Sequence, residues 1–267
     1  MHWTYAEYFL GIGAPGKAIN RVTKRHGDTC EFIYGFEIDK YARNAFAAIH
    51  GVDERKIYHD ITDQPETLPH VDIVFYSPPC QSFSLAGKRE GTTIDKGNLF
   101  YSALQGIIKS NPKYCIMENV ANLKNQFRND FNNMLRALEN AGYTSYAKVL
   151  NSKHYGIPQN RERIYIVGFL NHNIHFEFPV PINKNTRLGD ILEKDVDDKY
   201  TLSDKLWGGH QRRKAEHKKK GYGFGYSLFN ENSAYVNTIS ARYYKDGSEV
   251  LIQQDSKNPR RLTPREC

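Results

Sequence analysis

The sequence predicts an α/β protein in which a doubly wound, mostly parallel sheet is followed by a smaller second lobe. Two features of the sequence predict this architecture. Between residues 8 and 169, short apolar runs alternate with amphipathic stretches, which is typical of a sheet covered by helices on both faces. After Asn171 the alternation ends in Phe-Glu-Phe-Pro-Val-Pro, and a polar segment with glycine-rich and basic pieces follows. We therefore expect a boundary between two lobes near residues 181–187.

The individual elements follow from local residue patterns. Apolar residues at helical spacing predict helices over residues 14–24, 40–50, 98–109 and 129–141. Apolar or β-branched runs predict strands over residues 8–13, 32–38, 56–58, 71–76, 114–117, 146–150 and 164–169. The run VDIVFY at 71–76 is the strongest of these strand patterns. Because ligands of such a sheet bind at the carboxyl ends of its strands, the residues that follow the strands are the first candidates for function.

The composition is that of an ordinary globular protein. The chain has 267 residues, 39% of them hydrophobic and 25% charged, which suits one large domain or a domain with a smaller lobe. It has no run of 18 apolar residues and no cationic start, so we expect neither a membrane-spanning helix nor a secretory signal. The four cysteines, Cys30, Cys80, Cys115 and Cys267, form no CxxC pair. We therefore expect no metal, and a reducing, cytoplasmic compartment.

The positive charge is concentrated in one segment. Lysines and arginines exceed acids by 37 − 30 = +7 over the whole chain. Residues 205–220 contain seven basic residues and one acid, Glu216, so +6 of this charge lies there. A solvated helix face is the simplest interpretation of such a run, and a surface that binds a polyanion is the functional one.

The first strand and turn indicate a nucleoside-like cofactor. Residues 9–16 read FLGIGAPG, and glycines at the end of a first strand let the backbone approach a ligand closely. Glu37 ends the second strand about twenty residues later, where an acid can hold ribose hydroxyls. A further acid, Asp60, precedes Ile61 where another strand should end. A tight turn alone would explain the glycines, but the three spaced elements together favour a nucleoside site.

The segment SPPCQSFS at 77–84 follows the strongest strand and holds the most reactive side chain of the sequence. Two prolines before Cys80 would hold its thiol rigid and accessible at the strand end, whereas a buried structural cysteine is the alternative. Glu118, in MENV at the end of the next strand, would lie beside it as a proton donor or hydrogen-bond partner. Arg161 and Arg163, in QNRERIY, enter an apolar strand and require a fixed partner there.

Taken in order, FLGIGAPG, SPPCQSFS, MENV, QNRERIY and RLTPREC resemble the motifs of cytosine-5 DNA methyltransferases, especially those of bacterial and phage modification systems. The resemblance covers nearly the whole chain. It implies a Rossmann-like S-adenosylmethionine-dependent methyltransferase domain with a small target-recognition domain. It also implies S-adenosylmethionine as the methyl donor and a flipped-out cytosine in a short duplex sequence as the substrate. Such an enzyme protects DNA in a restriction-modification or phage anti-restriction setting.

The resemblance implies a role for each of the four residues named above. The Cys80 thiolate would add to C6 of the cytosine, and Glu118 would hold N3 and the exocyclic amine. Arg163 would fix the O2 atom of the base, while Arg161 would buttress the site or bind a phosphate. The target must leave the duplex to react, which costs a few kcal/mol.

The resemblance also assigns cofactor and DNA contacts. The implied cofactor-binding residues are Phe9, Gly11, Ile12, Gly13, Glu37, Asp60, Ile61, Pro79 and Leu99. The sequence departs from the family at Gly13-Ala14, where two glycines are usual. The implied DNA contacts are Ser84 and Lys88 in a loop that closes over DNA, and Arg212, Arg213, Gly223, Thr238, Ile239 and Arg242 in the recognition region.

The expected domain organisation has three parts: a catalytic domain at 1–186, a target-recognition domain at 187–248, and a hinge that begins the return to the catalytic domain at 249–267. A further C-terminal segment is usual in the family, so a missing fragment is one expected partner, beside duplex DNA and a cognate restriction endonuclease. We expect a monomer in the cytoplasm of a bacterial or phage-infected cell. A transfer-RNA cytosine-5 methyltransferase and an inactive DNA-binding remnant remain as alternatives.

Overall fold

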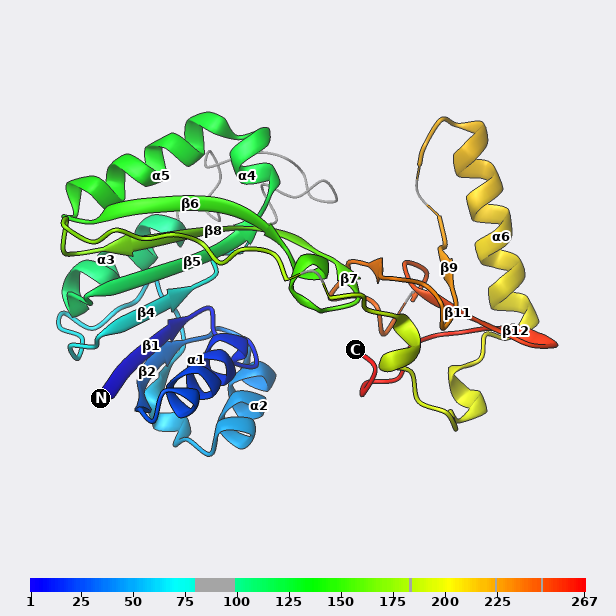
Figure 1. Cartoon of the computed structure of the whole chain (residues 1–267), viewed down its shortest axis with the longest axis horizontal. Helices are drawn as coiled ribbons and strands as arrows, with labels where there is room; N and C mark the ends of the chain where they lie inside the picture. Colours follow the sequence, from blue (N-terminus) through cyan, green and yellow to red (C-terminus); the bar gives the residue numbers. More distant parts are fainter. Residues whose placement is uncertain (80–98, 183, 224, 246) are drawn as a thin grey trace. The chain divides into compact units, whose positions relative to one another are not determined.

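The computed structural model describes residues 1–79, 99–182, 184–223, 225–245 and 247–267, which form two compact units (Figure 1). The first unit comprises residues 1–150 and 163–178, and the second comprises residues 151–162 and 179–267. The first unit therefore ends at 178, before the expected boundary at 186. The second unit takes in residues 151–162 from within the expected catalytic domain. The assignment of catalysis and target recognition to particular segments stays a prediction.

The first unit is built on a seven-stranded sheet with the order β3-β2-β1-β4-β5-β8-β6. Its strands are β1 (His2–Tyr8), β2 (Thr29–Phe36), β3 (Ile57–Tyr58), β4 (Ile73–Tyr76), β5 (Tyr114–Val120), β6 (Thr144–Asn151) and β8 (Glu162–Phe169). The five strands from β3 to β5 pair in parallel, and β8 runs antiparallel to β5. The parallel strands therefore end at one edge of the sheet, as the α/β prediction requires.

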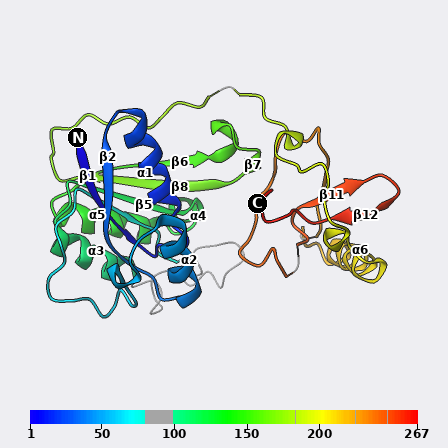
Figure 2. The ribbon, with the colours of Figure 1, turned by 90° about the horizontal axis from the view of Figure 1, so that it is seen from below.

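Helices cover both faces of this sheet (Figures 1 and 2). They are α1 (Ala14–Arg25), α2 (Lys40–His50), α3 (Leu99–Ser110), α4 (Asn122–Asn125) and α5 (Arg128–Asn140), with a 3-10 turn, η1, at Glu54–Lys56. The alternation of side chains along β1 supplies both cores. Tyr5 packs in the cluster that includes Ile19 of α1 and Phe46 of α2, whereas Tyr8 packs with residues of α3 and α5. The doubly wound fold class is thereby confirmed.

Most predicted elements match the observed ones within a few residues, but the first strand does not. Residues 8–13 were expected to be a strand, and β1 instead ends at Tyr8. Phe9, Gly11 and Gly13 have φ angles of 58°, 52° and 79°, in the left-handed region that no strand contains. The apolar run after Tyr8 is therefore a turn. By contrast, α2 spans the predicted residues because the Asp39 side chain accepts hydrogen bonds from the backbone N–H groups of Tyr41 and Ala42.

The second unit consists of short strands and one long helix around a small core. It contains η3 (Ser152–Tyr155), β7 (Gln159–Asn160), η4 (Leu188–Asp190), η5 (Asp198–Tyr200), α6 (Asp204–Lys219), β9 (Leu228–Phe229), β10 (Val236–Asn237), β11 (Leu251–Gln254) and β12 (Lys257–Arg260). Its core includes Leu188, Val236 and Ile252. Near the end of the chain, the buried Arg260 guanidinium donates to both carboxylate oxygens of Glu266, at 2.7 and 2.8 Å. Within the described residues, no helix is long and apolar enough to cross a membrane.

Candidate functional site

A pocket of about 160 Å³ lies at the carboxyl ends of the parallel strands in the first unit. It is lined by Phe9, Phe36, Glu37, Ile38, His59, Asp60, Ile61, Pro79 and Leu99. Six of the nine predicted cofactor residues are therefore brought together here, from the segments that follow β1, β2, β3 and β4 and from the start of α3. Their role in cofactor binding stays a prediction. Gly11, Ile12 and Gly13 form the adjacent turn and do not line the pocket.

The turn after β1 is tied to the end of β2 through the Glu37 carboxylate. Gly11 N donates to one Glu37 oxygen at 2.9 Å, and Asp39 N donates to the other, also at 2.9 Å. Each carboxylate oxygen can accept more than one hydrogen bond, so Glu37 keeps capacity for ligand hydroxyls. At Gly13, where α1 begins, an added Cβ would lie 2.3 Å from His50 Nε2. A glycine is therefore required at that position.

The sequence analysis missed Arg43, which fixes the backbone beside Glu37. Its Nη1 donates to the carbonyl oxygens of Glu37 and Ile38, at 2.9 Å each, and its side chain is buried. Glu54 lies 3.9 Å from its Nε. An arginine on the inner face of a predicted helix, six residues after the ribose-type acid, was the signal available. Phe36, Ile38 and His59 were missed as well, although each adjoins a predicted residue.

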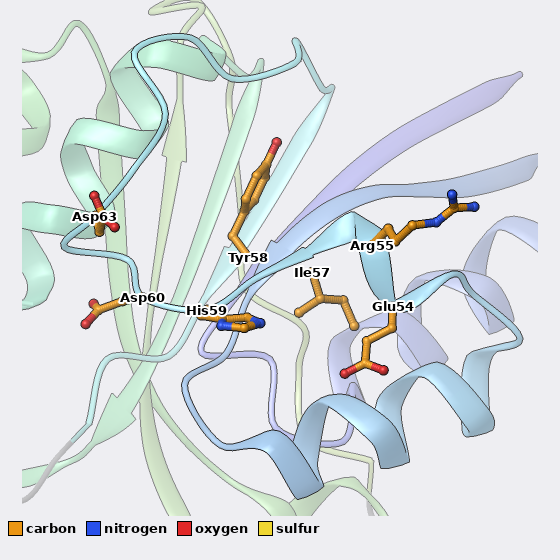
Figure 3. A pocket seen from close by; sticks show the side chains of 7 residues that line it. All are labelled: Glu54, Arg55, Ile57, Tyr58, His59, Asp60 and Asp63. Carbon is orange, nitrogen blue, oxygen red and sulfur yellow. The ribbon is translucent and has the colours of Figure 1, made fainter.

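His59 and Asp60 line both this pocket and a second, more open hollow at the edge strand β3. Figure 3 shows the side chains of the second hollow. This hollow is lined by Glu54, Arg55, Ile57, Tyr58, His59, Asp60 and Asp63. One Asp60 oxygen accepts hydrogen bonds from Thr62 N and Thr62 Oγ1, at 2.8 Å each. The backbone hydrogen bond from Thr62 lowers the pKa of the Asp60 carboxyl, so the group is ionised at neutral pH. Asp60 therefore presents a fixed negative charge at the pocket rim.

Glu118 and Arg163 form an ion pair in the first unit, with Glu118 Oε1 2.8 Å from Arg163 Nε. The antiparallel register of β5 and β8, which sets Glu118 opposite Tyr165 and Val120 opposite Arg163, brings the two side chains together. Asn119 Nδ2 donates to Pro78 O at 3.2 Å and so holds the segment before Cys80 against the end of β5. Cys80 itself lies outside the described residues. The Glu118 and Arg163 side chains are 28% and 17% exposed.

Arg161 belongs to the second unit, where its backbone is held on both sides. Its N–H donates to Asn151 Oδ1 at 3.2 Å, and its carbonyl accepts from Ser152 N at 3.1 Å. Asn151 Nδ2 also donates to Asn160 Oδ1 at 2.7 Å. The QNR part of the motif is thereby fixed by a buried asparagine. Asn151 was not singled out from the sequence, although it directly follows the strand predicted at residues 146–150 and ends the observed strand β6.

The predicted DNA contacts have different surroundings. Ser84 and Lys88 lie outside the described residues. Arg212, Arg213, Gly223 and Arg242 are exposed, and Ile239 packs against the core of the second unit. The Thr238 hydroxyl donates to Asn160 O at 2.8 Å, so it supports the strand that carries the QNR sequence. These DNA contacts stay predictions.

The basic segment forms the exposed helix α6, on which His210 is the one residue that is buried. One of its lysines has a structural role. Lys214 Nζ donates to Tyr226 O at 2.9 Å and lies 4.1 Å from the centre of the Tyr226 ring. The other basic residues of the helix, among them Arg212 and Arg213, keep an exposed, positive face. No cluster that could hold a metal occurs among the described histidines, cysteines and acids.

Comparisons with known proteins agree on one family. The model of the family described as C-5 cytosine-specific DNA methylase matches residues 4–267. The chain is 47% identical to the type II methyltransferase M.NlaX of Neisseria lactamica, covering 98% of this chain and 82% of that protein. It is 46% identical to M1.ScrFI of Lactococcus lactis subsp. cremoris, covering 98% and 67%. Among solved structures, the Entamoeba histolytica methyltransferase EhMeth is alike in fold, with a TM-score of 0.75, 18% identity, and coverage of 100% and 84%.

Proposed function

The chain belongs to the family of C-5 cytosine-specific DNA methylases, and from this membership we propose that it methylates a cytosine turned out of duplex DNA through a covalent Cys80–C6 bond. At the coarser level it is a DNA cytosine-5-methyltransferase that depends on S-adenosylmethionine. The residues that perform the reaction, the course of the reaction and the extrusion of the base are the proposal. The observation that carries it is the Glu118–Arg163 pair beside the segment that leads into Cys80.

The pocket at the strand ends fits the nucleoside part of S-adenosylmethionine. Phe9, Ile61 and Leu99 supply apolar surface for a purine, and the Glu37 carboxylate lies where ribose hydroxyls can donate to it. The ionised Asp60 at the rim accepts from the exocyclic amine of adenine. When bound, S-adenosylmethionine supplies an electrophilic methyl group, which C5 of the cytosine accepts.

The remaining chemistry belongs to residues of this chain. Cytosine C5 is a poor nucleophile, and addition of the Cys80 thiolate to C6 makes the ring an enamine that is nucleophilic at C5. One Glu118 oxygen accepts from the exocyclic amine while the other, carrying a proton, donates to N3 and relieves the negative charge that develops there. Arg163 donates to O2 and keeps the base in register with Glu118. Loss of the C5 proton to a base, return of the N3 proton to Glu118 and departure of the Cys80 thiolate then restore the aromatic ring.

The ion pair explains why both side chains must be present. Arg163 holds Glu118 Oε1 at 2.8 Å and so orients the Glu118 carboxyl for contact with the base. Removal of either residue would take the ion-pair partner away from a half-buried charge. The cytosine would also lose its hydrogen bonds either to Glu118, at N3 and the exocyclic amine, or to Arg163, at O2. Arg161 and the exposed face of α6 bind the DNA backbone in this proposal. The setting is a bacterial or phage-infected cell, where methylation protects DNA from a cognate restriction endonuclease.

Replacement of Cys80 by serine tests the proposal directly. We expect Cys80→Ser to abolish methyl transfer from tritiated S-adenosylmethionine to duplex DNA while DNA binding and the thermal midpoint are retained. Cys30→Ser, a change at a cysteine on β2, is the matched control and should keep full activity. Full activity of Cys80→Ser would refute the covalent mechanism. Bisulfite sequencing of DNA from expressing cells would identify the methylated sequence.

The same assay separates the two alternatives. Duplex DNA and transfer RNA are offered in parallel, and methylation of the RNA alone would establish the transfer-RNA enzyme instead. DNA binding without methylation of either substrate would establish a binding remnant. Relatives named as type II methyltransferases, at 47% and 46% identity, favour the DNA enzyme.

A further inference from the structure

A hollow in the second unit gathers positive charge that the proposed reaction does not use. It has a volume of about 350 Å³ and is lined by Lys153, His154, Pro181, Ile182, Lys184 and Asn185. Two of these residues are lysines and none is an acid. Among the described ion pairs, none neutralises Lys153, His154 or Lys184. The hollow is therefore a concentrated positive site that lacks a counterion from this part of the chain.

The backbone around the hollow is fixed by several hydrogen bonds. His154 O accepts from Ile182 N at 2.9 Å, which joins η3 to the segment that carries Lys184. Gly156, with a φ of +80°, ends η3, and a Cβ added there would lie 3.5 Å from Lys184 Cδ. The Lys184 stem therefore packs against this glycine. Lys153 Nζ lies 4.6 Å from the centre of the Tyr235 ring, which restricts its ammonium group.

The hollow is also connected rigidly to the QNRER motif. The single side-chain oxygen Asn151 Oδ1 accepts from both Lys153 N and Arg161 N, at 3.2 Å each. Ser152 Oγ adds a hydrogen bond to Gln159 O at 2.6 Å. The position of Lys153 is thereby set by the same residue that sets the Arg161 backbone. A ligand held by Lys153 would be placed in register with the arginine motif.

We propose that this hollow binds a phosphodiester group of the DNA backbone through Lys153 and Lys184, and that it positions the strand relative to Arg161. The proposal rests on the proposed function, because that function makes DNA the polyanion present. Lysine ammonium groups bind phosphate as point charges without reading the base, so the site contributes affinity and register rather than sequence choice. The mixed apolar and cationic lining, with Ile182 and Pro181 beside the lysines, suits a sugar–phosphate segment rather than a free ion.

The salt dependence of binding tests this site. The double variant Lys153→Gln/Lys184→Gln removes the two charges and keeps side-chain polarity. A fluorescent duplex is titrated with wild type and variant at several potassium chloride concentrations. The logarithm of the association constant falls linearly with the logarithm of the salt concentration. Each lost phosphate contact should make this line less steep by about 0.9, which is equivalent to about eightfold weaker binding at roughly 0.1 M salt. The loss should be the same for duplexes of different sequence, because no base is read.

A matched control removes two charges elsewhere. Lys24→Gln/Arg25→Gln changes two basic residues in the last turn of α1, in the first unit, and should leave the slope unchanged. Thermal midpoints establish that both double variants are folded. A Lys153→Gln/Lys184→Gln protein that has the wild-type slope and affinity overturns the phosphate site. Methylation of duplex DNA by the wild type is measured separately, so failure of this site and failure of the proposed function give different results.

Discussion

The glycine that begins α1 offers a test of how the turn after β1 is built. Gly13 has a φ of +79°, which costs a residue with a Cβ about 1–2 kcal/mol. An alanine Cβ would also lie 2.3 Å from His50 Nε2 and 2.5 Å from Phe46 Cε2. The two rings cannot move aside freely, since they stack with centroids 4.3 Å apart and His50 is hydrogen-bonded to Ile12 O. Overpacking of this kind adds about 1–3 kcal/mol.

Gly13→Ala should therefore destabilise the first unit by about 2–5 kcal/mol. Gly11→Ala is the matched control, because its φ is +52° and nothing lies within 4 Å of an added Cβ. Gly11→Ala should lower the free energy of unfolding only by the cost of the positive φ angle, about 1–2 kcal/mol. The predicted difference between the two variants is the packing term, about 1–3 kcal/mol.

Urea unfolding followed by tryptophan fluorescence can isolate the relevant unit. The chain has two tryptophans, Trp3 in β1 and Trp207 in α6. In a Trp207→Phe background, Trp3 reports on the first unit alone. Binding of S-adenosylmethionine, measured by calorimetry, should weaken more for Gly13→Ala than for Gly11→Ala, because only Gly13→Ala displaces His50 from the turn. Equal free energies of unfolding for the two variants would refute the packing argument.

Three further predictions concern buried ionisable groups. Burial raises the pKa of the Glu7 carboxyl from 4.5 to about 8, so folding takes up a proton in this range and the free energy of unfolding falls as pH rises from about 5 to 8. Glu7→Gln should flatten this pH dependence, measured by urea unfolding at several pH values. If the variant keeps the wild-type pH dependence, Glu7 is not its source. Arg43→Lys keeps the charge but loses the planar fork that reaches two carbonyls, so KM for S-adenosylmethionine should rise several-fold with little change in kcat; an unchanged KM would show that Arg43 does not position the pocket. Glu266→Gln leaves the buried Arg260 without its counterion and should destabilise the second unit by about 3–5 kcal/mol, read from Trp207 fluorescence in a Trp3→Phe background; a loss below about 1 kcal/mol would contradict this.

The elements that could be predicted from the sequence are those whose signals are local. The helix α2 matched its predicted residues because Asp39 caps its start and Gly51, in the left-handed region, ends it. The strand β4, at residues 73–76, was similarly evident because it lies within the β-branched and aromatic run predicted as a strand at 71–76. Residues 9–13 were misassigned because an apolar run has the same composition in a strand and in a turn. Only the backbone angles of Phe9, Gly11 and Gly13 distinguish the two.

The candidate site was predictable in its residues but not in its contacts. Phe9, Glu37, Asp60, Ile61, Pro79 and Leu99 could be named because each follows a strand or begins a helix, and they line one pocket. Arg43 was not found, since a basic residue on a short helix is more often solvated than buried. Its function depends on two carbonyl oxygens at the end of β2, which no periodicity reveals.

The sequence by itself determined the order of the motifs, the family, and the alternation of strands and helices that brings reactive residues to one sheet edge. The tertiary structure alone decided which of these residues touch. Glu118 meets Arg163 because β8 runs antiparallel to β5 in one particular register, and Asn151 joins Lys153 to Arg161 through a single oxygen atom. Such contacts depend on strand order, register and side-chain direction, which are set by packing across the whole fold and have no local signal in the chain.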